Sequence, residues 1–155
     1  TNIHQVFEHV RSLILAEYPV GITLRRDYDP SLPEFMADSG QLVQAILNIA
    51  RNAAQAINGQ GVICLRTRVE RNLTIGQKRY RLVLCAEIED NGPGIPEELR
   101  AHIFFPMVTG RPEGTGLGLS IARSIIHQHH GVIECISRPQ QTIFRIYLPL
   151  EYGHD

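Results

Sequence analysis

The chain has 155 residues, of which 43% are hydrophobic and 20% charged, and its formal net charge is −1. This length and composition predict a soluble, globular chain that forms one domain with a substantial core. The near-neutral charge gives no electrostatic reason to expect a nucleic-acid partner or an anionic membrane surface. No apolar run is long enough to span a bilayer, and the chain does not open on a signal-peptide pattern.

The three cysteines, Cys64, Cys85 and Cys135, lie in separate apolar runs without metal or disulfide spacing. We expect them to be buried free thiols in a reducing cytosol, and we expect the domain to be cytoplasmic. The chain starts without Met and opens directly on a periodic apolar segment. We therefore expect a domain from a longer protein.

The first third of the chain predicts two helices and a strand. Apolar residues at helical spacing predict a helix over 3–18, ended by a proline, and a short strand follows from Ile22. Asp38 predicts the N-cap of the second helix, Gln41 completes a capping box, and Asn58 followed by glycine predicts its end. The expected buried stripe of this helix consists of Leu42, Ile46, Ile49, Ala53 and Ile57. A second stripe beside it consists of Gln41, Ala45, Asn48, Asn52 and Gln55.

The rest of the chain predicts two hairpins around a third helix. The polar segment 71–79 is expected to link the first hairpin, and the helix is expected to run from about Gly116 to His130, where Gly131 stops it. The strands are predicted at 61–70, 80–90, 132–137 and 142–148. The residues of the third helix expected to face inward are Ile121, Ala122, Ile125 and Ile126. Three helices and about five strands in a single domain over 1–155 predict an α/β sandwich of two layers.

Two glycine clusters flank a short link. The first reads Asp-Asn-Gly-Pro-Gly-Ile-Pro at 90–96 and the second Gly-Thr-Gly-Leu-Gly-Leu-Ser at 114–120. Glycine lets a backbone approach a ligand closely, and the second cluster runs into a predicted helix, whose N-terminal amides favour phosphate. The spacing is neither the dinucleotide motif nor a Walker motif. The clusters indicate a nucleotide pocket closed by a lid, against the alternative of a glycine-rich helix cap.

Three groups of polar residues are open to more than one interpretation. Asn48 and Asn52 share a helical face, where Asn52 could offer an oxygen to Mg²⁺ or both amides could be solvated. Asp90 fits a plain turn, and it equally fits a carboxylate that accepts a hydrogen bond from the exocyclic amine of adenine. Thr109 and Arg111 in the link could reach phosphate oxygens or remain solvated.

The seven histidines do not predict a catalytic or metal site. None has a paired carboxylate at catalytic spacing, and no Cys/His set indicates zinc. His127, His129 and His130 lie near a predicted helix C-terminus, where positive charge is favourable, so a structural role is the better interpretation.

Taken together, the motifs resemble the catalytic, ATP-binding domain of bacterial sensor histidine kinases, in the group that includes gyrase B, the Hsp90 chaperones and MutL. The segment 38–56 resembles the N box, and the segment 90–94 resembles the G1 box. Residues 103–106, Ile-Phe-Phe-Pro, resemble the F box, and 114–119 the G2 box. The segment 105–111 further resembles NtrB-type nitrogen-regulation kinases. The resemblance implies the Bergerat ATP-binding fold, a mixed sheet packed on three helices, with a lid at about 106–114.

The resemblance also implies individual roles. Asn52 would ligate Mg²⁺ and Asn48 would lie beside it, the two being the expected catalytic residues. Asp90 would bind adenine, supported by Thr142. The implied ATP-binding residues are Asn48, Asn52, Asp90, Asn91, Gly92, Gly94, Ile95, Thr109, Arg111, Gly114, Thr115, Gly116, Leu117, Gly118 and Thr142.

The sequence departs from the family in three ways. ATPases of the group have a glutamate, which activates water, where this chain has Asn48, and this change favours transfer to histidine over hydrolysis. Gln141 replaces the usual glycine before Thr142. No histidine is followed by the acceptor pattern of the family, so the domain is expected to bind ATP without containing its own phosphoacceptor.

The implied function is transfer of the γ-phosphoryl of Mg-ATP to a histidine on a separate dimerisation domain of the same protein. A response-regulator aspartate would receive the phosphoryl next. The subfamily adds regulator dephosphorylation and a PII-like signalling partner. The isolated domain is expected to be a monomer and the full-length protein a homodimer. Alternatives are an ATPase of this group, a serine kinase of the anti-sigma type, and a nucleotide-binding regulatory module without transfer.

Overall fold

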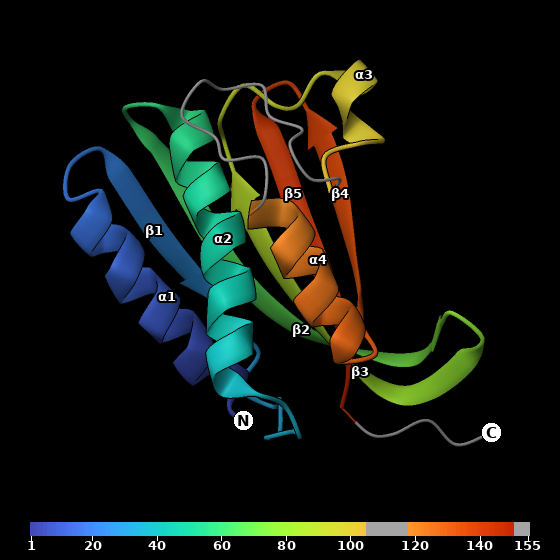
Figure 1. Cartoon of the computed structure of the whole chain (residues 1–155). Helices are drawn as coiled ribbons and strands as arrows, with labels where there is room; N and C mark the ends of the chain where they lie inside the picture. The colour runs from blue at the N-terminus through green and yellow to red at the C-terminus, as the bar shows by residue number, and fades with distance from the viewer. Residues whose placement is uncertain (105–117, 151–155) are drawn as a thin grey trace.

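The computed structural model describes residues 1–104 and 118–150. Within these residues, five strands form one sheet in the order β1-β2-β3-β5-β4, and α1, α2 and α4 lie on one face of it (Figure 1). The helices are α1 (Ile3–Glu17), α2 (Ser39–Ile57), α3 (Glu97–Arg100) and α4 (Gly118–Gln128). The strands are β1 (Ile22–Asp27), β2 (Gly61–Ile75), β3 (Lys78–Asp90), β4 (Val132–Arg138) and β5 (Gln141–Pro149). The predicted two-layer α/β fold with a mixed sheet is confirmed, because β1 pairs with β2 in parallel and the other neighbouring strands are antiparallel.

The core lies between the helices and the inner face of the sheet. Each fully buried aliphatic or aromatic side chain there contributes about 1.5–3 kcal/mol relative to exposure. The largest of these side chains are Phe7, Phe144, Ile3, Ile14, Leu42, Ile46, Ile49, Ile63, Leu65, Leu84, Ile88 and Ile126. This packing fixes α2 and α4 over the centre of the sheet.

The ends of α2 follow the predicted signals. The side chain of Asp38 accepts a hydrogen bond from the backbone N–H of Gln41 at 3.0 Å, as an N-cap does. Asn58 ends the helix in the left-handed conformation, with φ 48°. Four residues of the expected inward stripe are fully buried, while Ile57 at the last turn is half-buried.

The first hairpin is longer than predicted. The expected link 71–79 is almost entirely strand, because pairing continues with Leu73 opposite Tyr80 and Ile75 opposite Lys78. The chain reverses only at Gly76, with φ 63°, and the residue after it. The two strands therefore project beyond the sheet as an arm (Figure 1). Cross-strand pairing of apolar residues outweighs the turn-forming tendency of the polar residues between them.

Helix α4 differs from its prediction at its C-terminal end, because it ends at Gln128 and not at His130. The described helix begins at Gly118, and the expected start at Gly116 lies outside the described residues. His130, not Gly131, adopts the left-handed conformation, with φ 63°, while the Gly131 N–H bonds the Ile126 carbonyl at 2.9 Å. Glycine is needed at 131 for space, because a Cβ there would lie 2.3 Å from the Tyr147 carbonyl oxygen.

Ile121 was predicted to face inward and is 37% exposed, because it lies one residue before the inward face that begins at Ala122. The single-turn helix α3 was not predicted. It has too few residues for a periodic pattern to show.

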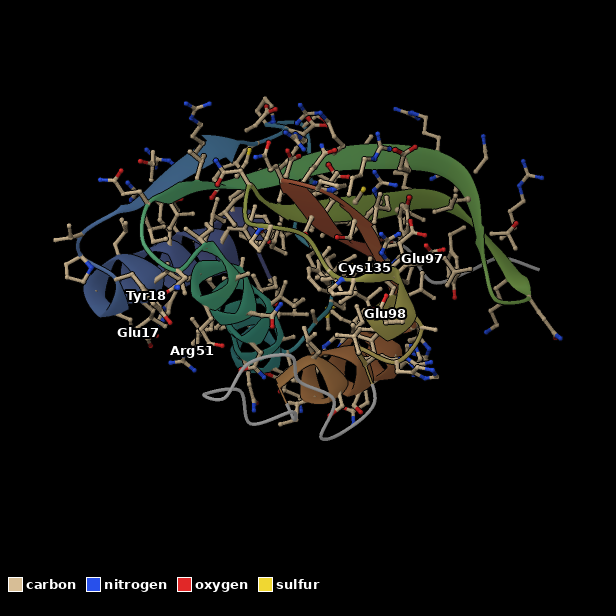
Figure 2. All side chains as sticks on the ribbon, turned by 90° about the horizontal axis from the view of Figure 1, so that it is seen from above. Glu17, Tyr18, Arg51, Glu97, Glu98 and Cys135 are labelled. Atoms are coloured by element: carbon tan, nitrogen blue, oxygen red, sulfur yellow. The ribbon has the colours of Figure 1, made fainter. Side chains whose placement is uncertain are left out.

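The outer face of the sheet is charged and gathers many of the polar side chains (Figure 2). Arg66 and Arg145 both form ion pairs with Glu87, at 3.0 and 2.6 Å. Burial raises the pKa of the Glu87 carboxyl, but the hydrogen bonds from Arg145 and Arg66 outweigh it and leave the pKa below its usual range. Arg66 also reaches Glu89 at 3.2 Å, so Glu89 faces outward while the next residue, Asp90, faces the helices.

His4 links α1 to the edge of the sheet. Its Nε2 lies 2.9 Å from the Thr67 hydroxyl, and its ring stacks on Tyr28 with centroids 4.6 Å apart. Burial lowers the pKa of His4, although the nearby carboxylates of Asp29 and Glu8 act in the opposite direction.

This lowered pKa predicts a pH-dependent stability. The unfolded chain binds a proton at His4 more readily than the folded chain does. The contribution of neutral His4 to the free energy of unfolding is therefore complete above the ordinary pKa of 6.5 and is lost as the pH falls below it. When the pH is lowered from about 7.5 to about 5.5, we expect the free energy of unfolding to fall less in His4→Gln than in the parent, as measured by urea unfolding. His9→Gln, on the exposed side of α1, is the control and should behave as the parent does. Identical pH dependence of parent and His4→Gln would contradict the prediction.

Candidate functional site

The candidate site lies at one end of the sheet, at the top of Figure 1. There β3 ends at Asp90, β4 ends near Ser137 and β5 begins near Thr142, which is directly opposite Asp90 in the sheet register. The C-terminal half of α2 and the start of α4 lie on the same side of the sheet. Residues distant in the sequence therefore meet at one end of the sheet.

Asp90 is a buried carboxylate, only 2% exposed. Its Oδ1 accepts a hydrogen bond from the Gly92 backbone N–H at 2.9 Å, which is the geometry of an Asx turn. The turn interpretation is thus correct as local structure. A plain turn does not require burial of the carboxylate, so its burial at the end of the sheet favours a role beyond the turn.

Two glycines let the loop after β3 pack closely against its neighbours. A Cβ on Gly92 would lie 3.0 Å from Asp90 Oδ1 and 3.3 Å from the Ala56 carbonyl of α2. Gly94 has φ 91°, and a Cβ there would lie 2.5 Å from the Arg138 carbonyl oxygen. The loop is therefore held between α2 and the end of β4.

Two buried hydroxyls, those of Ser137 and Thr142, lie beside this loop. Ser137 was not predicted from the sequence. The Ile95 N–H donates to Ser137 Oγ at 2.7 Å, and Ser137 Oγ lies 3.1 Å from Thr142 Oγ1. Ser137 and Thr142 are 7% and 3% exposed. The predicted hairpin could have indicated Ser137, because the β4–β5 register pairs it with Thr142.

The asparagine face of α2 points toward α4. Asn48 Nδ2 donates to the Gly118 carbonyl oxygen at 3.2 Å, so Asn48 ties α2 to the first residue of α4. Asn52 lies one turn further along the same face and is half-buried. The structure thus brings together Asn48 and Gly118, two of the predicted site residues.

The residue before Asn52 links α2 to α1. Arg51 donates from Nε and Nη2 to the carboxylate of Glu17 at the end of α1, with the shortest contact at 2.5 Å (Figure 2). The hydrogen bond from Arg51 lowers the pKa of Glu17. This two-pronged pair ties α2 to the end of α1.

Asn91 is exposed, and its side chain is engaged away from the turn. Its Oδ1 accepts from the Val62 N–H at 2.8 Å, at the start of β2. Among the described residues, Asn91 therefore anchors the loop to β2. The remaining predicted site residues, Thr109, Arg111, Gly114, Thr115, Gly116 and Leu117, lie outside the described residues, as does the expected lid at 106–114.

Among residues 1–104 and 118–150, the cysteines and histidines add no reactive group to this site. All three thiols are free, but only Cys85 is fully buried, whereas Cys64 and Cys135 are half-buried. Burial raises the pKa of the Cys135 thiol to about 12, so this thiol remains protonated. His129 bonds the Ile125 carbonyl through Nδ1 and accepts the Asp38 N–H at Nε2, a structural role like the one predicted.

The residues present fit a nucleotide with a hard cation. Among the described residues, no group of three or more His, Cys, Asp or Glu could hold a metal ion. Mg²⁺ does not need such a group, because it is commonly held by one or two protein oxygens together with substrate phosphates. The amide oxygen of Asn52 is a suitable ligand, and the buried Asp90 carboxylate is a suitable acceptor for an amine.

Residues 37–152 match the family described as histidine kinase-, DNA gyrase B- and HSP90-like ATPases. The chain therefore belongs to this family. Its sequence is 53% identical over 150 residues to the sensory histidine kinase/phosphatase NtrB of Escherichia coli O157:H7. It is 42% identical over 152 residues to the protein of that name from Rhodobacter capsulatus. Each match covers 96% of this chain but 43% of the relative, so the chain spans less than half the length of these relatives.

Solved structures agree with the sequence matches. The catalytic domain of the histidine kinase ThkA superposes with a TM-score of 0.82 and 28% identity, covering 97% of this chain and 93% of that one. Full-length ShkA in complex with AMPPNP superposes with a TM-score of 0.78 and 26% identity, covering 96% of this chain and 30% of that one. The resemblance to histidine-kinase catalytic domains is confirmed.

In the described part of the chain, every helix is too short or too polar to cross a membrane.

Proposed function

We propose that this chain is a single catalytic domain that binds Mg-ATP and presents its γ-phosphoryl to a histidine on a separate dimerisation domain. The observation that supports this most directly is the buried Asp90 carboxylate. It lies opposite Thr142, at the end of the sheet near the asparagine face of α2. A carboxylate only accepts hydrogen bonds, so it suits the amine of adenine and disfavours the keto group of guanine.

Asn52 is proposed to hold the magnesium ion through its amide oxygen, with Asn48 keeping α4 close. When bound, Mg²⁺ neutralises phosphate charge and helps to position the phosphoryl group. Gly92, Gly94 and Ile95 form the wall for the base. The glycines of the second cluster and Thr109 and Arg111 are proposed to contact the phosphates.

The chemistry proposed is displacement at phosphorus. A lone pair of the acceptor imidazole forms the P–N bond as the bond to the bridging oxygen breaks, and ADP leaves with that electron pair. Imidazole needs no general base for this attack. Asn48 replaces the water-activating glutamate of the related ATPases, and its Nδ2 is committed to the Gly118 carbonyl, so the domain is suited to transfer and not to hydrolysis.

We also propose a wider signalling role, which the similarity to NtrB proteins supports. In a protein of the NtrB type, the phosphoryl would pass to a response-regulator aspartate, and the protein would also promote regulator dephosphorylation under the influence of a PII-like partner. A histidine kinase ThkA has been solved in complex with the response regulator protein TrrA, with a TM-score of 0.75 to this chain and 25% identity, covering 97% of this chain and 41% of that one. We expect a cytoplasmic, full-length homodimer and a monomeric isolated domain.

The proposal is tested by calorimetric titration with a non-hydrolysable ATP analogue, with and without Mg²⁺, followed by labelling of a supplied histidine domain from ATP. Magnesium-dependent binding and labelled histidine are expected. Binding without labelling would favour a regulatory module, and rapid ATP turnover by the chain alone would favour an ATPase. Labelling of serine on a partner would favour the anti-sigma type of kinase.

Gly94→Ala tests the close approach of the loop to β4. The added Cβ would have to displace the Arg138 carbonyl or the loop, so we expect weaker binding of the ATP analogue and a stability loss of about 1–3 kcal/mol. Calorimetric titration and thermal unfolding measure the two effects. Gly76→Ala is the matched control, since Gly76 also has positive φ but has open space around it in the distant hairpin turn. Unchanged affinity in Gly94→Ala would contradict the prediction.

A further inference from the structure

Asn91 continues the pairing of β2 with β3 by one step after β3 has ended. The last pair in register is Ile63 opposite Asp90, so one step further Val62 would lie opposite Asn91. These two residues do exchange two hydrogen bonds. The Asn91 N–H donates to the Val62 carbonyl oxygen at 3.3 Å, and the Val62 N–H donates to Asn91 Oδ1 at 2.8 Å. In a regular antiparallel pair the second acceptor would be the backbone carbonyl of residue 91, and here the side-chain oxygen takes its place.

This replacement lets the chain leave the sheet while the next residue stays in register. An asparagine side chain can accept a hydrogen bond that would otherwise need the backbone, so the backbone after Asp90 is free to turn. The side chain also has a place prepared for it in β2. A Cβ on Gly61 would lie 2.7 Å from Asn91 Oδ1 and 2.6 Å from Ile57 Cγ2, so only glycine fits at 61 beside this side chain.

The segment 91–95 is thereby fixed at both ends. At its far end the Ile95 N–H donates to Ser137 Oγ at 2.7 Å. Between the ends, Gly92 packs on the Ala56 carbonyl of α2. At its near end the side-chain bond is the one between Asn91 and Val62, whose acceptor is therefore already engaged within the protein. This engagement indicates that Asn91 acts through the loop and not through a contact with a ligand.

We propose that Asn91 is a positioning residue, which raises nucleotide affinity by keeping the segment 91–95 in its binding-competent arrangement and makes no contact with the nucleotide. The inference rests on the proposed nucleotide-binding function. The apparent affinity falls in proportion to the fraction of molecules that are in the competent arrangement. The loss of one ordinary hydrogen bond changes such a fraction by about 3- to 10-fold.

The first test is calorimetric titration of the ATP analogue into Asn91→Ala and Asn91→Asp, in about 0.3 M salt to screen the added charge of the aspartate. Asn91→Ala removes the acceptor for the Val62 N–H and should bind the analogue about 3- to 10-fold more weakly. Asn91→Asp keeps an oxygen acceptor and loses the NH₂ group, so it should bind within about 2-fold of the parent. A contact from that NH₂ group to the nucleotide would give the same loss in both variants, which would overturn the inference.

The second test is amide hydrogen exchange at Val62, measured by NMR without nucleotide. We expect exchange to be at least about 3-fold faster in Asn91→Ala than in the parent, because the amide loses its acceptor. In Asn91→Asp the rate should stay near that of the parent. Unchanged exchange in Asn91→Ala would show that the side chain does not anchor the loop and would overturn the inference.

Asn2→Ala is the matched control. Asn2 Oδ1 also accepts one backbone N–H, that of His4 at 2.9 Å, but it does so at the start of α1, at the opposite end of the fold from the candidate site (Figure 1). Asn2→Ala should lower the melting temperature, as removal of an N-cap does, and leave nucleotide affinity unchanged.

An equal loss of affinity in Asn2→Ala and Asn91→Ala would assign the effect to general destabilisation and would overturn the inference. If the parent binds the analogue normally, each of these contrary results leaves the proposed function intact. No binding by the parent would remove both.

Discussion

Asn52→Ala is expected to reduce phosphoryl transfer to a supplied histidine domain by at least about 10²- to 10³-fold. The variant removes the amide oxygen proposed to hold Mg²⁺, and with it the charge neutralisation on which phosphoryl transfer depends. The rate of histidine labelling from ATP measures the loss. Titration of the ATP analogue with and without Mg²⁺ should show that the variant no longer distinguishes the two conditions.

Gln44→Ala is the matched control for this variant. Gln44 is also an amide side chain of α2, but it is exposed and lies two turns before Asn52, so its loss should leave transfer near the parent level. Near-normal labelling by Asn52→Ala would refute the role of Asn52. Equal loss in both variants would indicate a general effect on α2 and not the loss of a metal ligand.

Asp90→Asn is expected to weaken binding of the ATP analogue by about 10- to 100-fold, as lost hydrogen bonds to a charged acceptor do. The substitution keeps the volume of the side chain and can keep the bond from the Gly92 N–H, so the turn should survive. It removes the charge and brings an NH₂ group, which only donates, next to the amine of adenine. Calorimetric titration measures the affinity, and thermal unfolding verifies that the fold is intact.

Glu89→Gln controls for loss of a carboxylate at the same end of the strand. Glu89 precedes Asp90 but faces the outer side of the sheet, where it pairs with Arg66, so its neutralisation should leave nucleotide affinity unchanged. Parent-like affinity in Asp90→Asn would remove the adenine-binding role. A similar loss in both variants would show that negative charge at this end of the sheet, and not a contact between Asp90 and adenine, determines the nucleotide affinity.

The ends of the helices were largely predictable because the signals are local. Asp38 and Asn58 act through the backbone of their own segment, and both have the roles that were predicted. Where local signals compete with tertiary packing, the prediction was wrong. The link 71–79 is strand because of its partners across the hairpin. After α4 the left-handed residue is His130, while Gly131 is needed for its close approach to Tyr147.

The sequence by itself determined the family, the two-layer class and most of the candidate residues, because the motifs are contiguous and their order is specific. It left open whether Asp90 is only a turn residue and whether Asn48 is solvated. The tertiary structure decided that Asp90 is buried opposite Thr142 and that Asn48 is bonded to the start of α4.

The predicted hairpin could have placed Ser137 beside Thr142, but only the structure shows that Ser137 also bonds Ile95. Its position depends on the register of β4 against β5 and on the loop that brings Ile95 within hydrogen-bond distance. A shift of one residue in that register would have turned Ser137 to the opposite face of the sheet, because side chains alternate along a strand. Contacts between distant segments depend on such register and packing, and a motif read along one stretch of chain does not contain them.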